Sequence, residues 1–462
     1  MNIIVIVSDT FRRDNLTEET PVETPNLNDF ASRATVFNKC YISSFPTIPH
    51  RTDLLSGRYS FPWHGWKPLD PEIPIISSWL RENGYLGQLI ADTPHLMKEN
   101  YYFDRSLHAS KWIRGQESDW EFTRFNQPLE EVVPDEKTRR EGYKDTGFNP
   151  PSEYKWHNSE WTWEEDHLCA RVARSASKWL DLNYKSEDFF LWIDMFDPHE
   201  PWDPPEYFVK RYDGDYEGVP MIHPNYGPAS EYTGEELQNM RAHYYGEVTL
   251  VDKWIGYILE KIEEVGLMDD TMIVFTSDHG IYVGEHDRTA KSNIHPQDER
   301  YWPLYEELTR VPLMIYHPQG KRGEEIDQLV QPVDISATIL DQAGVRLDSD
   351  GEVHGRSLLP IVTAEKERGI REYAFSSGNL NVDQKNKHTI WPTVTNDEWS
   401  YLTLGSEGEA ELYHLKEDPG QEENLIEGNR AQARKMHAAL VEWLKEIEAP
   451  ERSIENMRSI SP

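Results

Sequence analysis

Short apolar runs that end in an acidic or polar turn recur along this chain, and they constrain its fold more than any other feature. The runs read IIVIV, LGQLIAD, FFLWIDMF, MIVFTSD and VPLMIY. Their length and their β-branched and aromatic residues are typical of strands buried on both faces. Segments with helical spacing lie between them, among them LNDFASRATVF and GEVTLVDKWIGYILEKIEEVG. Because strand and helix alternate, we predict an α/β fold with one large, mostly parallel sheet sandwiched by helices.

Two regions depart from this alternation. Residues 112–165 are rich in Trp, Pro and charge and have no clean period, so we expect an excursion over the carboxyl edge of the sheet. From about residue 371, EYAFSSG, EWSYLTLG and EAELYHL predict short antiparallel strands, and a helix should follow at about 431–448. The 462 residues therefore divide into an α/β domain, 1–370, and a small C-terminal α+β subdomain, 371–462.

The composition is strongly acidic, with 82 Asp and Glu against 47 Lys and Arg and a formal net charge of -35. Such a surface repels nucleic acid and anionic membranes, so we expect neither as a partner. It also repels small anions at long range, so an anion site would need a local cation or a metal. The acidity equally suits the solubility of a salt-tolerant host.

The cysteines and the N-terminus bear on the compartment. Cys40 and Cys169 form neither a disulfide framework nor a zinc-cluster spacing. The first apolar run has no basic segment before it and is too short for a signal or a membrane span, so we expect a cytoplasmic protein. The sequence leaves a homo-oligomer open.

Acidic residues and histidines stand where the predicted strands end. They are Asp9, the turn that carries Asp194, Asp197 and His199, and the pair Asp278-His279. Ligands of open α/β sheets bind at the carboxyl ends of the strands. A single Asp at such a place is more often a helix cap. The stretch SDHG is a stronger signal, because carboxylate and imidazole together suit Mn, Zn or Fe.

The stretch SSFPTIPHRTDLLSGRY places a hydroxyl at the start of a predicted helix. Pro49 suits the first turn, which puts Thr47 at or just before the N-cap. Thr47 would then be a cap worth about 1 kcal/mol. Alternatively, the helix dipole and a nearby metal would favour its alkoxide, with Arg51 steadying the charge. The stretch alone does not separate these readings.

Several of these motifs, taken together, resemble one family. Thr47 to Tyr59 resembles the sulfatase signature, Cys-or-Ser-x-Pro-x-Arg followed by Leu-Leu-x-Gly-Arg, and agrees at every defined position except the first. IVSDT, FTSDHG, GEHDRTAK and DPHEPWDPP resemble further family landmarks in the same order. The chain is therefore identified as a member of the sulfatase branch of the alkaline phosphatase superfamily. This implies an alkaline-phosphatase-like fold with a small C-terminal antiparallel sheet plus helix, and a metal-dependent hydrolase of small anionic sulfate, phosphate or phosphonate esters.

The resemblance also implies roles for particular residues. One divalent ion (Mn, Zn, Fe or Ca) would be held by Asp9, Thr47, Asp278 and His279. Arg51 and Lys291 would bind substrate and stabilise developing negative charge, and His199 would protonate the leaving alcohol. His95 would be a further substrate contact.

The sequence departs from the family at the nucleophile. Threonine is a secondary alcohol and cannot become the aldehyde of formylglycine, so a covalent ester on Thr47 must be hydrolysed by water. That is easier at phosphorus than at sulfur, which favours phosphate or phosphonate (di)esters with Thr47 as covalent nucleophile. The alternatives are a true sulfate-ester hydrolase and a catalytically inactive sulfatase-fold binding protein. The predicted metal-binding and substrate-binding residues are retained, which argues against a loss of catalytic activity.

Other departures affect the metal and the substrate contacts. Thr10 replaces a common second Asp, which favours a transition metal over calcium, and Asp92 replaces the Lys that precedes His95 in the family. A second ion would need His199, Asp194 or Asp197, and His354, although their spacing fits two-metal enzymes poorly. The tryptophans of the excursion either wall a leaving-group pocket or only pack it onto the core; they are Trp112, Trp120, Trp156, Trp161 and Trp163.

Overall fold

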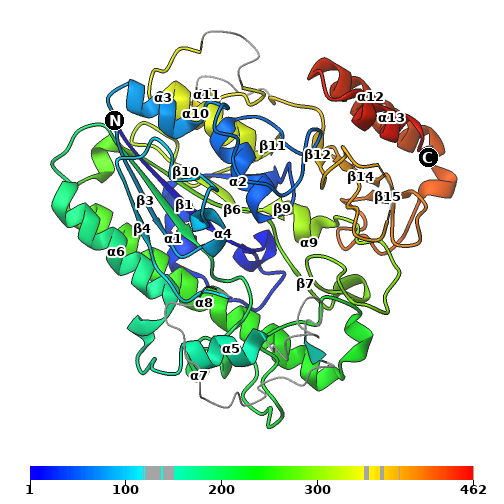
Figure 1. Cartoon of the computed structure of the whole chain (residues 1–462), viewed down its shortest axis with the longest axis horizontal. Helices are drawn as coiled ribbons and strands as arrows, with labels where there is room; N and C mark the ends of the chain where they lie inside the picture. Colours follow the sequence, from blue (N-terminus) through cyan, green and yellow to red (C-terminus); the bar gives the residue numbers. More distant parts are fainter. Residues whose placement is uncertain are drawn as a thin grey trace.

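The computed structural model describes residues 1–117, 119, 137–138, 150–347, 353–364, 369–383 and 386–460. Its centre is a nine-stranded sheet with the order β11-β2-β10-β6-β1-β5-β3-β4, and β9 pairs with β2 (Figure 1). The strands are β1 (Asn2–Ser8), β2 (Thr35–Tyr41), β3 (Leu86–Ala91), β4 (Ala109–Trp112), β5 (Phe189–Met195), β6 (Thr271–Ser277), β9 (Arg310–Val311), β10 (Leu313–Tyr316) and β11 (Glu324–Val330). The pairs around β1, β3 and β5 are parallel, while β10 runs antiparallel to both of its neighbours. The large, mostly parallel sheet is therefore confirmed.

Side chains of the central strands alternate between two apolar cores, one on each face of the sheet. In β1, Ile4 and Ile6 enter one core, while Ile3, Val5 and Val7 enter the other. The first core is closed by α1 (Pro25–Arg33), α6 (Leu168–Asn183) and α8 (Gly234–Glu264). The second is closed by α2 (Thr47–Ser56), α3 (Ile76–Glu82), α10 (Pro332–Gln342) and α11 (Leu359–Val362). Two-sided burial explains why the runs are continuously apolar.

A four-stranded antiparallel sheet follows in the C-terminal part, with the order β12-β13-β14-β15. Its strands are β12 (Ala374–Ser376), β13 (Thr393–Thr395), β14 (Trp399–Leu402) and β15 (Glu411–His414). Two helices lie beside it at one end of the molecule, α12 (Arg430–Glu446) and α13 (Glu451–Arg458) (Figure 1). The predicted small sheet plus helix is confirmed, although the helical region contains a second helix that starts after Pro450. The domain boundary near residue 370 stays a prediction.

Some local predictions were wrong. The segment predicted as one helix, LNDFASRATVF, leaves α1 at Arg33 and enters β2 at Thr35, because its last residues are β-branched and aromatic. β13 was not predicted. The remaining short elements are α4 (Pro94–Met97), α5 (Pro150–His157), α7 (Glu206–Val209), β7 (Tyr282–Val283), β8 (Thr289–Ala290) and α9 (Glu306–Thr309).

The predicted excursion, residues 112–165, lies partly outside the described residues, and Trp120 is among those not described. Trp161 and Trp163 line a pocket of 480 Å³ together with Tyr207 and Lys253, and none of its lining residues is a predicted site residue. Trp161 packs against Tyr154, as the packing alternative predicted. None of the described helices combines the length and the apolar character needed to span a bilayer.

Candidate active site

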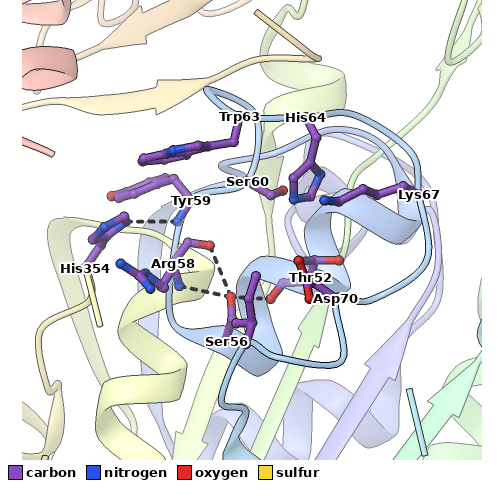
Figure 2. A pocket seen from close by; sticks show the side chains of 11 residues that line it. Thr52, Ser56, Arg58, Tyr59, Ser60, Trp63, His64, Lys67, Asp70 and His354 are labelled. Carbon is purple, nitrogen blue, oxygen red and sulfur yellow. Dashed lines mark hydrogen bonds between the residues drawn. The ribbon is translucent and has the colours of Figure 1, made fainter. Parts of the chain in front are cut away.

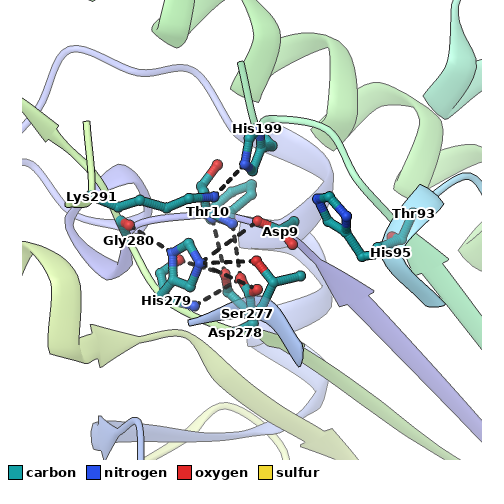
Figure 3. Close-up of polar contacts among 12 residues, drawn as sticks. Asp9, Thr10, Thr93, His95, His199, Ser277, Asp278, His279, Gly280 and Lys291 are labelled. Carbon is teal, nitrogen blue, oxygen red and sulfur yellow. Dashed lines mark hydrogen bonds and ion pairs between the residues drawn. The ribbon is translucent and has the colours of Figure 1, made fainter. Parts of the chain in front are cut away.

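The ends of two neighbouring parallel strands bring three predicted metal ligands together. In the register of β1 and β6, Ser8 lies opposite Ser277, so Asp9 and Asp278 leave the sheet side by side. His279 follows directly, and its Nε2 lies 3.5 Å from Asp278 Oδ2 and 4.0 Å from Asp9 Oδ1 (Figure 3). All three residues are fully buried, and their ligand atoms lie within 4.8 Å of one another.

His279 is held in the form that binds a cation. Its Nδ1–H donates to the carbonyl of Gly280 at 2.9 Å, so Nε2 keeps its lone pair and points it toward the carboxylates. Burial lowers the pKa of His279 to about 4, so the ring is neutral near pH 7. Fixing one ring nitrogen by a backbone carbonyl is the usual support of a metal-binding histidine.

Asp9 shows where a cation is needed. Among the described residues, neither of its oxygens accepts a hydrogen bond, although the side chain is completely buried, and its ion pair is with Arg51 Nη1, 3.0 Å from Oδ2. Burial raises the pKa of Asp9 well above its usual value, and the charge of Asp278 raises it further. A buried carboxylate without donors is costly unless a cation neutralises it. Two carboxylates and one imidazole are therefore a donor set that fits a divalent ion.

Thr47 is the first residue of α2, and Pro46 occupies the N-cap position without a capping side chain. The sequence placed Thr47 at or before the cap, so it lies one residue further into the helix than predicted. Its hydroxyl lies 3.5 Å from His279 Nε2, and its residue is 1% exposed. The hydroxyl thus faces the three predicted metal ligands, Asp9, Asp278 and His279, rather than the backbone of its own helix. Thr47 and the ligands at the strand ends are brought together as predicted.

Arg51 lies beneath these residues and is wholly enclosed. Its Nε and Nη2 donate to Asp194 at 2.9 and 2.8 Å, and its Nη1 donates to Asp278 at 2.6 Å. The guanidinium is thus occupied by carboxylates and neutralises part of the buried negative charge. Its predicted contact with substrate stays a prediction. Sequence reasoning missed Asp194 as the partner of Arg51, although Asp194 interrupts the apolar run FFLWIDMF near its end.

Lys291 and His199 face each other above the carboxylates (Figure 3). His199 Nδ1–H donates to the carbonyl of Glu200 at 2.7 Å, so its Nε2 accepts a hydrogen bond from Lys291 Nζ. Burial, and then the charge of Lys291, lower the pKa of His199 well below its usual value. His199 is therefore neutral without an anion in the site, and its predicted role as the acid stays a prediction.

His95 reaches the same edge from α4. Its Nε2 lies 3.3 Å from Glu117, and its ring contacts Trp66 and Phe196 at centroid distances of 5.0 and 5.7 Å. Trp66 and Glu117 were not predicted. Because Trp66 and Glu117 contact His95, they would lie close to any substrate that binds His95.

His50 was also missed, although it lies inside the signature. It is fully buried, and neither ring nitrogen has a hydrogen-bond partner among the described residues. Burial lowers its pKa to about 3, so the ring is neutral. The only sequence signal was its spacing, three residues after Thr47 on one helix, which places neighbours on the same face.

The residues proposed for a second ion do not gather beside the predicted site of the first ion. Asp194 accepts hydrogen bonds from Arg51 and from the hydroxyl of Thr93. Asp197 accepts hydrogen bonds from the Gln116 side chain and the Cys169 N–H, and belongs to a different buried group with Cys169 and Glu247. His354 stacks on Tyr59 at 5.7 Å, beside a separate pocket. The prediction that these residues together hold a second ion was therefore wrong, because they do not form one cluster.

Comparison with known proteins identifies the family and the fold of the chain. The family described as Sulfatase matches residues 1–345, and the C-terminal region of N-sulphoglucosamine sulphohydrolase matches residues 297–449. The arylsulfatase of Clostridium perfringens is 27% identical over 486 aligned positions, covering 96% of this chain and 93% of the relative. The phosphonate monoester hydrolase of Agrobacterium radiobacter superposes with a TM-score of 0.72 at 20% identity, covering 97% of this chain and 95% of that one. A protein solved with its substrate D-glucosamine-2-N,6-O-disulfate gives 0.71 at 19% identity, covering 98% and 99%.

The fold and these relatives define an ester hydrolase with an alkaline-phosphatase-like architecture. The chain belongs to the sulfatase family, since the family match covers most of its length. The identification from the signature and the strand-end motifs is confirmed.

Proposed function

We propose that this protein hydrolyses phosphate or phosphonate (di)esters and that Thr47 is the covalent nucleophile. The observation that carries the proposal is the Thr47 hydroxyl, placed at the start of α2 and 3.5 Å from His279 Nε2, within a set of buried metal-ligand side chains. The positive end of the helix dipole favours an oxyanion at that place. Asp9, Asp278, His279 and the Thr47 hydroxyl would hold a divalent ion, whose charge lowers the pKa of a bound hydroxyl and polarises an ester.

The first half of the reaction transfers the phosphoryl group to the protein. Thr47 Oγ attacks phosphorus in line and releases its proton to solvent, and the bond from phosphorus to the leaving oxygen breaks as that oxygen takes a proton that His199 has gained from solvent. Lys291 stabilises the charge that develops on the transferred group. The anionic substrate beside Lys291 and His199 raises the affinity of His199 for a proton, which it then passes to the leaving alcohol.

The second half restores Thr47. Water attacks the phosphoryl-threonine, the bond between phosphorus and Thr47 Oγ breaks, and the hydroxyl recovers its proton. The products are the alcohol and inorganic phosphate, or a monoester or phosphonate. A Thr ester has no carbonyl to re-form, so this step depends on water, and phosphorus permits it more readily than sulfur.

Sulfate-ester hydrolysis is the second candidate, because the Clostridium perfringens relative is an arylsulfatase. A panel of p-nitrophenyl sulfate, phosphate, phosphodiester and phosphonate esters separates the two. Acid-quenched enzyme should carry an added phosphoryl mass on the peptide that contains Thr47. An added sulfuryl mass would assign the sulfate reaction. No added mass, and no turnover of any ester by metal-loaded protein, would leave a sulfatase-fold binding protein.

A further inference from the structure

A pocket of 410 Å³ lies beside α2, away from the predicted catalytic residues (Figure 2). Thr47 and Arg51 share one face of the helix because they are four residues apart. Thr52 and Ser56, which line the pocket, share a face about 100° further round the helix axis. None of the described lining residues belongs to the predicted active site, so this pocket is a separate feature of the molecule.

The pocket is locally cationic in a protein whose formal net charge is -35. Arg58 and Lys67 line it, and Asp70 is the one carboxylate among its described lining residues. Within the described part of the chain, neither cation forms an ion pair, whereas most other buried or half-buried cations of the molecule do. Two uncommitted cations in one cavity are therefore an unusual local arrangement for this chain, and a small anion would complement them.

One wall of the pocket is aromatic and presents a hydrogen-bond donor. The His354 ring is near-parallel to those of Tyr59 and Trp63, with ring centroids at 5.7 and 5.9 Å and interplanar angles of 21° and 25°. Its Nδ1 accepts the Tyr59 N–H at 3.1 Å, so Nε2 carries the ring proton (Figure 2). Burial, and then the charge of Arg58, lower the pKa of His354 to about 4, so the ring acts as a neutral donor.

A second pocket lies beyond this wall. It measures 470 Å³, shares Tyr59 and His354 with the first, and is lined further on by Trp443, Arg356, Arg371, Glu372, Glu442 and Glu446. An occupant long enough to use both would keep its anionic group in the first pocket, because Arg371 is already paired with Asp334 and three carboxylates line the second. Its body there would have to be uncharged and able to pack on aromatic rings while accepting hydrogen bonds. A saccharide ring has that chemistry, with C–H faces and peripheral hydroxyls.

We propose that this pocket binds an anionic saccharide, with its sulfate or phosphate group at Lys67 and its sugar ring against Tyr59 and His354 on the side of Arg58, as a site separate from Thr47 (Figure 2). The proposal does not depend on the reaction at Thr47, because no residue is shared between the two sites.

Isothermal titration calorimetry on the metal-loaded enzyme tests it. The probes are 6-deoxy-6-sulfoglucose and its 6-phosphono counterpart, whose C–S and C–P bonds replace the ester, and glucose and inorganic sulfate are the comparison ligands. In Lys67→Ala, binding of at least one charged sugar should weaken about tenfold or more, since a charge-assisted hydrogen bond is lost. Lys67→Arg should keep the binding. Lys178→Ala, an exposed lysine on α6, is the matched control and should match the wild type.

The two probes report which anion the pocket prefers, and either one supports the proposal if its binding depends on Lys67. Equal affinity of Lys67→Ala and Lys178→Ala for both charged sugars would overturn it. If glucose binds as tightly as the charged sugars, the pocket does not require an anionic group. If inorganic sulfate binds as tightly, the pocket does not recognise the sugar ring. Either result would overturn the proposal. These results are independent of turnover, so a failure of the Thr47 mechanism would leave them interpretable.

Discussion

The Thr47 hydroxyl combines two features that a helix cap does not need. It begins α2 without capping it, and it lies beside the neutral Nε2 of His279. A hydroxyl used only to start the helix would bond to the backbone of the first turn, and Thr47 does not. Its chemistry should therefore be visible in activity rather than in stability.

Replacing Thr47 tests this directly. Thr47→Ala should lower kcat/KM on the order of 10³-fold or more, as loss of a nucleophile does elsewhere. Thr47→Ser should stay active, because Ser supplies a hydroxyl without the β-branch that restricts χ1. Steady-state kinetics on the preferred p-nitrophenyl ester measures both. Wild-type rates in Thr47→Ala, with about 1 kcal/mol of lost stability, would return Thr47 to the role of a cap.

Asp9 and Asp278 should differ when the metal is absent. Asp9→Asn should abolish bound metal but leave the unfolding temperature of the metal-free protein nearly unchanged or higher, because Asp9 accepts no hydrogen bond among the described residues and the cost of burying its charge outweighs the ion pair with Arg51. Asp278→Asn should lose metal and also stability, since Asp278 accepts from Arg51 and from the N–H groups of Thr10 and His279. Elemental analysis and thermal unfolding check both. Full metal occupancy in Asp9→Asn would place the ion elsewhere.

His199 should matter most when the leaving group is poor. His199→Gln keeps an acceptor for Lys291 but has no proton to give, so esters of alkyl alcohols should lose on the order of 10²–10⁴-fold in kcat/KM. Esters of p-nitrophenol should lose far less, because that anion leaves without help. A leaving-group series measured by initial rates gives the comparison. Equal losses for both classes would assign His199 to orienting Lys291.

The single residues most open to prediction were those directly after apolar runs. Asp9, Asp278 and His279 could be placed because parallel strands deliver their carboxyl ends to one edge. The partners of Arg51 could not, since a fully buried guanidinium ion-paired with three carboxylates depends on how α2 packs across the ends of β1, β5 and β6. The ring of His50, which has no hydrogen-bond partner among the described residues, likewise follows from tertiary burial, and only its spacing from Thr47 is visible in the sequence.

At the scale of elements, α6 and α8 pack together against β5 and enclose an acidic group near its end. Glu247 of α8 and Asp197 lie with Cys169, and Tyr154, Asp203 and Lys155 surround them. Burial, and then the charge of Asp197, raise the pKa of Glu247 well above its usual value. Burial also raises the pKa of Asp197 to about 6. The folded state therefore binds protons that the unfolded state releases.

This sets the sign of a pH effect. The pKa of the Glu247 carboxyl is higher in the folded state than its value of about 4.3 in the unfolded state. The folded state is therefore favoured most below that unfolded value, and this stability is lost as the pH rises through the folded pKa. Glu247→Gln removes that loss, so it should unfold at a higher temperature than wild type at pH 8, and the difference should vanish near pH 4. Glu260→Gln, exposed on the same helix, is the control and should show no such trend. A Glu247→Gln protein less stable than wild type at pH 8 would show that the carboxylate has a compensating partner.

Elements were predictable where one period dominated. The 31-residue α8 and the buried strands β1, β5 and β6 have clear apolar patterns. β2 was missed because it starts two residues after α1 ends, within one continuous pattern. The antiparallel direction of β10 also had no local signal, since strand direction is set by the chain's path between distant elements.

At the scale of the whole molecule, the small sheet does not stand apart from the large one. Its apolar core includes Tyr59 and Phe61, which follow α2, and Val333 of α10. The boundary predicted near residue 370 is therefore crossed by shared packing. A change in the C-terminal helices can reach α2 through Trp443, whose ring lies 4.8 Å from that of Tyr59.

The net charge of -35 acts over the same whole-molecule scale and opposes the local cations of the site. Between about 0.01 M and 0.1 M salt the Debye length falls from about 30 Å to about 10 Å. Long-range repulsion of an anionic ester is then largely screened, whereas attraction by Lys291, which is 8% exposed, acts at contact and is screened little. The value of kcat/KM should therefore rise with salt over this range, and more steeply for a dianionic monoester than for a monoanionic diester. Initial rates at fixed pH, with NaCl and then KCl to exclude a specific ion effect, measure the slopes. A fall in kcat/KM with added salt for both esters would mean that a positive local field, rather than the acidic surface, governs how substrate reaches Thr47.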